Sequence, residues 1–417
     1  MTPAARLQAA IEVLDRIAST RQPADQVLKA WGTHNRYAGS KDRRAIADRV
    51  YLALRERGGE GAGRRMVLAS LKLDDGLPDG EVESLFSGLG HAPAPLAAEE
   101  RAWLADLAAA TRLPAFIEAE LQRGFGAEWR EEAEALLKTR APLDIRINTL
   151  KADPDTIKQV LDGTGLAWAA TDYTFFGIRI EGSPDVQALP AFQDGILEIQ
   201  DEGSQIAAAM VDARMGETVI DYCAGGGGKT LALAADMHAK GRLIASDINP
   251  RRLDAIRPRL ARAGAAAELR LLEPGTMDDM AGQADRVLVD APCSGSGTWR
   301  RRPEEAWRLT EAELRRLNAI QAEVLSEAAA LVRPGGRLVY VTCSVLPSEN
   351  ADVVDQFAAS HPEFTPLSVA EGARLAKLSP EARERLAELS HGGHTVQLSP
   401  RRTGTDGFFI ALFQRIP

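Results

Sequence analysis

Residues 221–230, Asp-Tyr-Cys-Ala-Gly-Gly-Gly-Gly-Lys-Thr, decide the fold of this chain. The apolar run from Glu217 to Cys223 predicts a strand, four glycines follow it, and a helix begins after them. Glycines at such a turn let the backbone approach a ligand closely, at a cost in conformational entropy. Two ligand classes fit: a phosphate on the helix N-terminus, or S-adenosylmethionine, whose methionine half lies against such a loop. A P-loop would need a glycine where Cys223 stands, which counts against the first class.

The strand–helix alternation continues on the C-terminal side. Short apolar runs at Arg242–Asp247, Asp285–Asp290 and Gly336–Thr342 alternate with helical segments. This pattern predicts an α/β fold with a doubly wound, Rossmann-like parallel sheet, which binds ligands at the carboxyl ends of its strands. Asp247 ends the strand that follows the glycine loop and could bind ribose hydroxyls. Asp247 could equally be a helix N-cap.

The chain divides into three predicted domains. Residues 1–138 have apolar residues at helical spacing, with breaks at 57–63 and 87–95, and predict an all-helical domain. Residues 139–200 predict a small α/β subdomain, because LDIRINTL at 143–150 alternates polar and apolar residues. Residues 201–417 form the predicted Rossmann-like domain.

Composition excludes several classes of protein. The 417 residues carry a net charge of −9, which disfavours a surface coated with basic groups. Residues 36–65 are nevertheless +5, with nine Lys/Arg and four Asp/Glu, and Arg300–Arg302 form a second basic cluster. No segment is long and apolar enough for a membrane span, and the N-terminus reads as a helix of a cytoplasmic protein. Three cysteines make a disulfide framework improbable, and no metal site is expected, HGGH at 391–394 included.

All three cysteines follow predicted strands of one sheet. Cys223, Cys293 and Cys343 stand at the expected carboxyl ends, whereas cysteines serving only as core residues would have no reason to gather there. Thiols beside a methyl donor suggest chemistry on a pyrimidine: a thiolate that adds to carbon 6 of cytosine makes carbon 5 nucleophilic. Asp290 is the candidate acid in this chemistry, and Lys229 is a nearby cation.

Together these motifs resemble the Nop/Sun-domain family of RNA 5-methylcytosine methyltransferases. The resemblance covers residues 140–417 and rests on the order DYCAGGGGKT, SDINPRRL, DAPCSGSGTWRRRPE and TCSVLPSEN, with RINTLK, IQDEGSQ and GTDGFFIA around them. Residues 1–138 are similar to the NusB-like RNA-binding domain of the bacterial Sun/RsmB type, which methylates small-subunit ribosomal RNA. That similarity rests on helical texture and DRRAIADRVYLALR.

The resemblance implies a role for each matching residue. Cys343 is the nucleophile, Cys293 helps to release the methylated base, and Asp290 holds the edge of the cytosine. S-adenosylmethionine is the implied cofactor, and Arg252 has an orienting role beside it. The implied cofactor residues are Cys223, Ala224, Gly225, Gly226, Gly227, Gly228, Lys229, Asp247, Arg252 and Asp290.

Two departures from the family pattern leave alternatives open. The family usually has Ala-Pro-Gly-Gly-Lys in the loop, where this chain has Gly-Gly-Gly-Gly-Lys at 225–229, so Gly226 replaces the proline. The family also has an acid near the adenine, where this chain has Leu-Leu-Glu-Pro-Gly at 271–275, and Glu273 could take its place. A catalytically dead transferase that acts as an RNA-binding assembly factor is therefore the rival interpretation, and transfer RNA is the alternative substrate. An enzyme for exocyclic amines would show Asn/Asp-Pro-Pro-aromatic, and a DNA cytosine-5 enzyme would lack the Thr-Cys partner.

RNA is the expected partner, and the chain is expected to act as a monomer. Phosphate contacts are expected from residues 36–65, from Arg146 and from Arg300–Arg302. Trp299 and Trp307 could stack on RNA bases or belong to the core.

Overall fold

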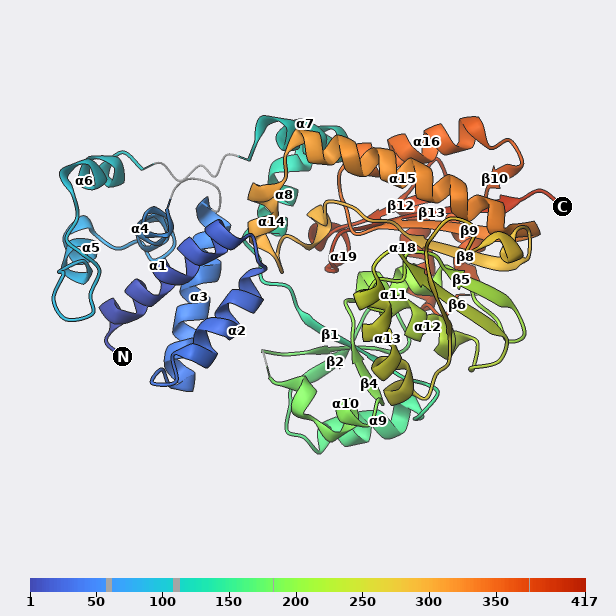
Figure 1. Ribbon diagram of the computed structural model, residues 1–417, viewed down its shortest axis with the longest axis horizontal. Coiled ribbons are helices and arrows are strands. Elements are labelled where there is room, and N and C mark those ends of the chain that lie inside the picture. The colour runs from blue at the N-terminus through green and yellow to red at the C-terminus, as the bar shows by residue number, and fades with distance from the viewer. Residues whose placement is uncertain (58–61, 108–112, 183, 375) are drawn as a thin grey trace. The chain divides into compact units, whose positions relative to one another are not determined.

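The computed structural model describes residues 1–57, 62–107, 113–182, 184–374 and 376–417 (Figure 1). The chain forms two compact units, and both are discontinuous in sequence. The helical unit comprises Met1–Ala119, Ala133–Thr139 and Thr298–Thr310; the sheet unit comprises Glu120–Glu132, Arg140–Gly297 and Glu311–Pro417. The three domains expected from the sequence stay predictions, and part of the expected break at 57–63 lies outside the described residues.

The N-terminal region is helical, as the apolar spacing predicts. Thr2 caps the first helix by accepting the Ala5 N–H at 3.2 Å, and Leu7, Ile11 and Leu14 on its inner face are buried. The helices are α1 (Pro3–Thr20), α2 (Ala24–His34), α3 (Ser40–Arg57), α4 (Gly63–Leu73), α5 (Asp79–Leu85), α6 (Ala98–Ala105), α7 (Ala115–Phe125) and α8 (Trp129–Leu137).

A segment from the C-terminal half of the chain completes the helical unit. Within this unit, α14 (Pro303–Arg308) lies against the N-terminal helices. The Trp307 indole N–H donates to the Leu54 carbonyl at 2.9 Å, and Arg308 donates to the Ile17 carbonyl at 2.9 Å. The Glu304 carboxylate accepts the Ala24 N–H at 2.9 Å. These contacts cap free backbone groups of the helices with side chains of α14.

A small antiparallel sheet follows the helices in sequence, in the order β2-β3-β1-β4. Ile145 and Ile147 lie in its core cluster and the partly buried Leu143 packs against it, which confirms the face predicted from their alternation. Its elements are β1 (Leu143–Ile147), α9 (Pro154–Asp162), β2 (Trp168–Ala170), β3 (Gly177–Ile180), α10 (Pro190–Gln193) and β4 (Leu197–Ile199).

The large sheet has the order β11-β12-β13-β9-β8-β5-β6-β7, and β10 pairs with β13. The run β9-β8-β5-β6-β7 is parallel, which confirms the predicted Rossmann-like fold. The strands beyond β9 are antiparallel and were not predicted. The strands are β5 (Thr218–Asp221), β6 (Arg242–Asp247), β7 (Glu268–Leu271), β8 (Ala284–Asp290), β9 (Val332–Thr342), β10 (Phe364–Pro366), β11 (Ser390–His391), β12 (Thr395–Leu398) and β13 (Phe408–Arg415).

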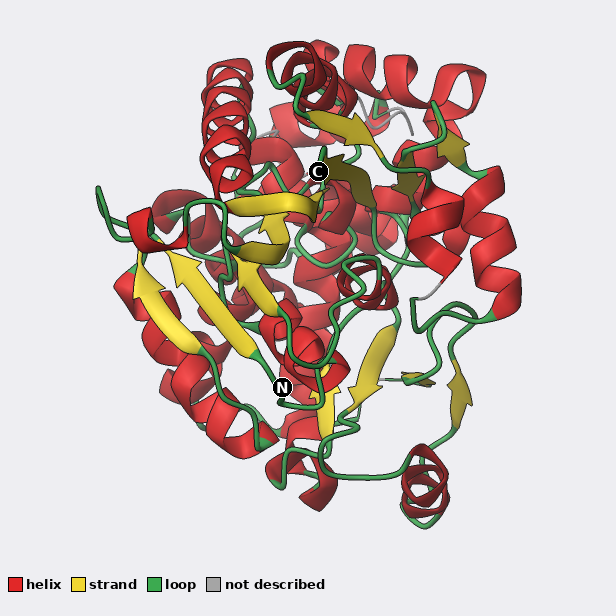
Figure 2. Ribbon diagram, turned by 90° about the vertical axis from the view of Figure 1, so that its right-hand side faces the viewer, coloured by secondary structure: helices red, strands yellow, loops and turns green. Residues whose placement is uncertain are grey.

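Helices cover both faces of this sheet, which is drawn with yellow strands in Figure 2. Successive strand residues point to opposite faces, so Val219 belongs to the core with α11 and α12, and Ile220 to the core with α15 and α16. The helices are α11 (Glu202–Ala209), α12 (Gly228–Asp236), α13 (Pro250–Ala263), α15 (Glu311–Leu331), α16 (Ala351–Ser360), α17 (Val369–Arg374), α18 (Pro380–Glu388) and α19 (Pro400–Thr403). No helix among the described residues is long and apolar enough to cross a bilayer.

Candidate active site

Two of the three cysteines meet at the carboxyl edge of the large sheet. Cys293 follows β8, Cys343 follows β9, and their sulfur atoms are 3.4 Å apart. The contact with Cys343 and burial raise the pKa of Cys293 well above its usual value. A raised pKa favours the protonated thiol at Cys293, and either sulfur can be the hydrogen-bond donor in this contact.

The third cysteine has a different environment. Cys223 follows β5 and packs against the apolar core on the α15 side of the sheet. Burial, with the negative charge of Asp290 as the next cause, raises the pKa of the Cys223 thiol. A thiol that resists ionisation is a poor nucleophile, so the geometry separates Cys223 from the pair.

An ion pair between a buried lysine and a half-buried aspartate lies beside the two thiols. Lys229, on the first turn of α12, donates to Asp290 Oδ2 at 2.8 Å, and its ammonium lies 5.0 Å from the centre of the Phe408 ring. Burial by itself would lower the pKa of Lys229, but the charge and hydrogen bond of Asp290, followed by the charge of Cys343, raise it overall. Lys229 is therefore a cation held next to the Asp290 carboxylate.

The glycine loop approaches the end of β6. Gly225 and Gly227 have φ angles of 54° and 80°, which favour glycine, and a side chain on Gly225 would point into open space. The Gly225 N–H donates to Asp247 Oδ2 at 3.0 Å. The loop thus leaves an open backbone surface beside a buried carboxylate.

Asp247 is not the cap of the following helix. Its Oδ1 accepts the Asn249 N–H at 2.7 Å, and the N-cap of α13 is Asn249, whose side chain accepts the Arg251 N–H. Arg252 reaches to 3.8 Å from Asp247 Oδ2. The next residue, Ile248, is 76% exposed, so an apolar surface faces solvent beside the carboxylate. Ile248 was not predicted as a site residue, although a large apolar residue directly after a strand-end acid is a local signal.

The acid at the end of β5 is fully buried. Thr230 Oγ1 donates to Asp221 Oδ2 at 2.6 Å, whereas Oδ1 has no partner among the described residues. Burial raises the pKa of Asp221 to about 7, and the charge of Asp290 adds to this rise. The orphaned oxygen is a polar group beneath the glycine loop that lacks the partner that buried groups normally have.

The carboxylate of Glu349 joins the loops that carry the two thiols. It is fully buried, and Ser294, one residue after Cys293, donates to it through its backbone N–H at 2.7 Å and its hydroxyl at 2.5 Å. Ser344, one residue after Cys343, donates its hydroxyl at 2.5 Å. Gln321 donates at 3.0 Å. Glu349 was not predicted as a site residue, although the motif TCSVLPSEN at 342–350 contains it, because its burial and its partners depend on distant segments.

Other predicted contacts take different places. Arg146 is 6% exposed and donates to Gln200 Oε1 at 2.7 Å, so the expectation that it contacts RNA phosphates is wrong: the ladder of the small sheet turns it inward. Trp299 and Arg300 are also buried. Trp299 is therefore core. Glu273 is exposed after β7, and its role stays a prediction.

The fold and site define a Rossmann-like methyltransferase. A family model described as "16S rRNA methyltransferase RsmB/F" matches residues 208–414. The "Probable ribosomal RNA small subunit methyltransferase B" of Bacillus subtilis is 32% identical over 74% of this chain and 68% of that protein. The "Ribosomal RNA small subunit methyltransferase B" of Pseudomonas syringae pv. tomato is 32% identical over 71% of this chain and 65% of that protein. The chain belongs to this RsmB family.

Solved structures have the same fold. The crystal structure of PH0851 has a TM-score of 0.79 at 23% identity and covers 100% of this chain and 99% of that chain. A methyltransferase homolog protein from Pyrococcus horikoshii has a TM-score of 0.58 at 26% identity, over 73% of this chain and 100% of that one. The NusB-like character of residues 1–138 stays a prediction.

The cofactor of this family is S-adenosylmethionine, and the residues of the site fit it. The open face at Gly225, the carboxylate of Asp247 and the exposed Ile248 offer a backbone surface, a hydrogen-bond acceptor and an apolar contact. Among the described residues, no group of three or more His, Cys, Asp or Glu side chains is placed to hold a metal ion.

The buried carboxyl of Asp221 predicts a pH dependence of stability. Its pKa rises from 3.8 to about 7 on folding, so the folded state binds the proton more tightly than the unfolded state. The stabilisation is fully present below pH 3.8 and is lost as the pH rises through about 7. The native chain loses this stabilisation as the pH rises, whereas Asp221→Asn has no carboxyl to titrate. The unfolding free energy of Asp221→Asn minus that of the native chain should therefore increase by roughly 2–3 kcal/mol from pH 5 to pH 9.

Urea unfolding at the two pH values measures this difference. Asp172→Asn, at an exposed carboxyl of the same unit, is the control and should show no such change. An Asp221→Asn variant whose advantage is the same at both pH values would contradict the protonation of Asp221.

Proposed function

We propose that this chain methylates carbon 5 of a cytosine in small-subunit ribosomal RNA, with S-adenosylmethionine as methyl donor. The observation that carries the proposal is the pair of thiols 3.4 Å apart, next to the ion pair of Lys229 and Asp290. The names of the relatives support ribosomal RNA as substrate. The matched segment spans about two thirds of their length, so the activity of the whole chain is our inference.

Cys343 is the nucleophile in this proposal. Lys229 stabilises its thiolate, which adds to carbon 6 of the cytosine and pushes electron density to carbon 5. When bound, S-adenosylmethionine supplies an electrophilic methyl group to carbon 5. The carbon 5 proton then leaves to a base, and the bond from carbon 6 to sulfur breaks, which returns Cys343 to its thiolate form.

Cys293 assists the last step, and Asp290 holds the base. In this proposal Cys293, whose sulfur lies 3.4 Å from that of Cys343, is protonated and donates a hydrogen bond to the thiolate as the product leaves. Asp290 is half-buried and turns one oxygen to Lys229; its other oxygen accepts from the amino edge of the cytosine. The target base must be single-stranded or leave its stack to reach this position.

Residues of the glycine loop and β6 would hold the cofactor. Asp247 accepts from the ribose hydroxyls, Arg252 steadies its carboxylate, and the backbone of residues 223–228 lies along the methionine half. Ile248 covers the adenine in this proposal, with Glu273 as the candidate acid at its edge.

RNA contacts come from the helical unit in this proposal. Its segment 36–65 exposes Arg36, Lys41 and Arg44, and Tyr37 next to them is 72% exposed. Exposed cations bind phosphates, and an exposed aromatic ring among them stacks on unpaired bases. The prediction that residues 1–138 and 139–200 are RNA-binding parts and 201–417 the catalytic part agrees with this role. We also retain the predictions of a cytoplasmic monomer.

Bisulfite sequencing of ribosomal RNA tests the function. One small-subunit cytosine should lose protection when the gene is deleted and regain it with the native chain, but not with Cys343→Ala, which lacks the nucleophile. Cofactor affinity of Cys343→Ala, measured by calorimetry, should be unchanged and serves as the control for folding. Restored protection with Cys343→Ala would refute the nucleophile; lost protection in transfer RNA would change the substrate, and no change at all would favour the assembly-factor role.

Replacing the second thiol should trap the intermediate. Without the hydrogen bond of Cys293, the leaving thiolate of Cys343 is destabilised, so Cys293→Ala should accumulate a covalent protein–RNA adduct. The adduct is visible as a slower band on a denaturing gel. The matched control is the double variant Cys293→Ala/Cys343→Ala, which should give no band; a band in both variants would show that the link does not form at Cys343.

Glu349 is a positioning residue for the thiol pair. Since its carboxylate binds both cysteine loops, Glu349→Ala should lower kcat about 100-fold, as expected for a displacement of about 1 Å, with KM for RNA nearly unchanged. Glu349→Gln keeps the shape and should recover at least a tenth of the native kcat.

The same substitution separates positioning from folding. In the Cys293→Ala background, Glu349→Ala should slow adduct formation by a similar factor, while circular dichroism shows a folded chain. A native rate of adduct formation would contradict the role assigned to Glu349.

A further inference from the structure

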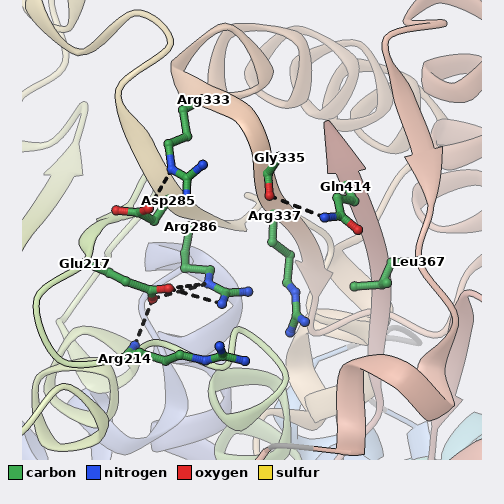
Figure 3. Close-up of a pocket in the computed structure, with 9 residues that line it drawn as sticks. All are labelled: Arg214, Glu217, Asp285, Arg286, Arg333, Gly335, Arg337, Leu367 and Gln414. Atoms are coloured by element: carbon green, nitrogen blue, oxygen red, sulfur yellow. Dashed lines mark hydrogen bonds and ion pairs between the residues drawn. The ribbon is translucent and has the colours of Figure 1, made fainter. Parts of the chain in front are cut away.

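A basic pocket lies at the amino edge of the large sheet (Figure 3), at the opposite ends of the strands from the thiols. Its volume is about 210 Å³. The lining comes from the turn before β5, the starts of β8 and β9, the segment after β10 and the end of β13. The residues used below are Arg214, Glu217, Asp285, Arg286, Arg333 and Arg337.

Three of these arginines share one carboxylate oxygen. Oδ2 of Asp212 lies 2.6 Å from Arg214, 3.6 Å from Arg286 and 3.8 Å from Arg337. Figure 3 shows their guanidinium groups gathered on one side of the pocket. One carboxylate oxygen cannot accept good hydrogen bonds from three guanidinium groups. Some N–H donors of these arginines are therefore available to another acceptor.

Positive charge exceeds negative charge around the pocket. Glu217 pairs with Arg286 at 3.2 Å, and Asp285 pairs with Arg333 at 2.6 Å. Four arginines thus face three carboxylates: Asp212, Glu217 and Asp285. Arg337 has the weakest ion pair of the four arginines, because its nearest carboxylate oxygen, on Asp212, is 3.8 Å away. It also donates a hydrogen bond to the Met210 carbonyl at 3.1 Å.

The side chain of Arg337 is 11% exposed. Burial, and then the charge of Arg286, lower the pKa of Arg337 to about 10, so it remains charged at neutral pH. A buried cation without its own counterion is unfavourable. An anion in the pocket would relieve this cost.

We propose that this pocket binds a phosphate group. Arginine forks match the oxygens of phosphate in pairs, and the pocket is smaller than the roughly 300–1,000 Å³ of sites for drug-sized ligands. The phosphate is either one link of the RNA backbone or a free phosphate. The RNA source rests on the proposed function, whereas the phosphate chemistry does not.

Two binding measurements on the full chain test the proposal. Calorimetry with inorganic phosphate should show saturable binding that is at least fivefold weaker in Arg337→Gln and in Arg214→Gln. Binding of a small-subunit ribosomal RNA transcript should be measured over a range of salt concentrations. If the pocket holds a backbone phosphate, the slope of log K for RNA binding against log salt concentration (the RNA salt slope) should fall in magnitude by about one in the same variants.

The controls separate the pocket from general charge and from folding. Arg385→Gln is the charge control. The side chain of Arg385 is 47% exposed, against 49% for Arg214, and each arginine pairs with a nearby acid. This variant should change neither the phosphate affinity nor the RNA salt slope. Arg214→Gln and a charge insertion, Gln414→Glu, remain informative if Arg337→Gln does not fold.

Each outcome decides between sources. Weaker phosphate binding with an unchanged RNA slope supports a free phosphate as the ligand and overturns the RNA source. A reduced RNA slope supports the backbone. Equal phosphate binding and equal RNA slopes in native and variant chains overturn the pocket as a site. Neither assay depends on turnover, so an inactive methyltransferase would leave the test intact.

Discussion

The buried carboxylate of Glu349 is the interaction on which the arrangement of the two thiols depends. A fully buried acid is tolerated only when donors surround it. Here the donors come from Ser294, beside Cys293, from Ser344, beside Cys343, and from Gln321. Satisfying this one group therefore requires that both cysteine loops are in place. A backbone hydrogen bond also joins the two loops, because the Gly297 N–H donates to the Cys343 carbonyl at 3.0 Å.

The topology of the sheet makes that interaction possible. Cys293 and Cys343 are far apart in sequence, but β8 and β9 are neighbours in one parallel sheet, so the loops after them meet at the same edge. β5 and β6 lie next in the order and bring the glycine loop to Asp247. The antiparallel strand β13 adds Phe408, whose ring lies under Lys229. The glycine loop and the thiol pair therefore lie at neighbouring strand ends because their strands are neighbours.

The two edges of the sheet carry different chemistry. At the carboxyl edge, the charge of Lys229 is matched by that of Asp290. At the amino edge, arginines outnumber the acids around Asp212. A net charge of −9 for the chain conceals both features. Local charge in partly buried surroundings acts more strongly on a neighbouring group than the net charge of the chain does, because the effective dielectric constant there is low.

Much of the fold could be predicted from local patterns. Alternating apolar residues placed Ile145 and Ile147 on one face of a strand, and strand–helix alternation indicated a parallel Rossmann-like sheet with a glycine loop after β5. These are periods of two and 3.6 residues, which each segment carries by itself. The antiparallel strands after β9 were not predicted, because an isolated apolar run such as Phe408–Leu412 does not specify the direction of its partner.

The sequence by itself determined the types of element, their order and the chemical groups at the strand ends. The family resemblance already assigned Cys343 and Cys293 to the chemistry. Only the tertiary structure decided that their sulfur atoms lie 3.4 Å apart while Cys223 packs in the core, and that Asn249, not Asp247, caps its helix. It also buried Arg146 and placed Thr298–Thr310 with the N-terminal helices. The physical reason is that these outcomes depend on desolvation and on partners distant in the chain, which no local period encodes.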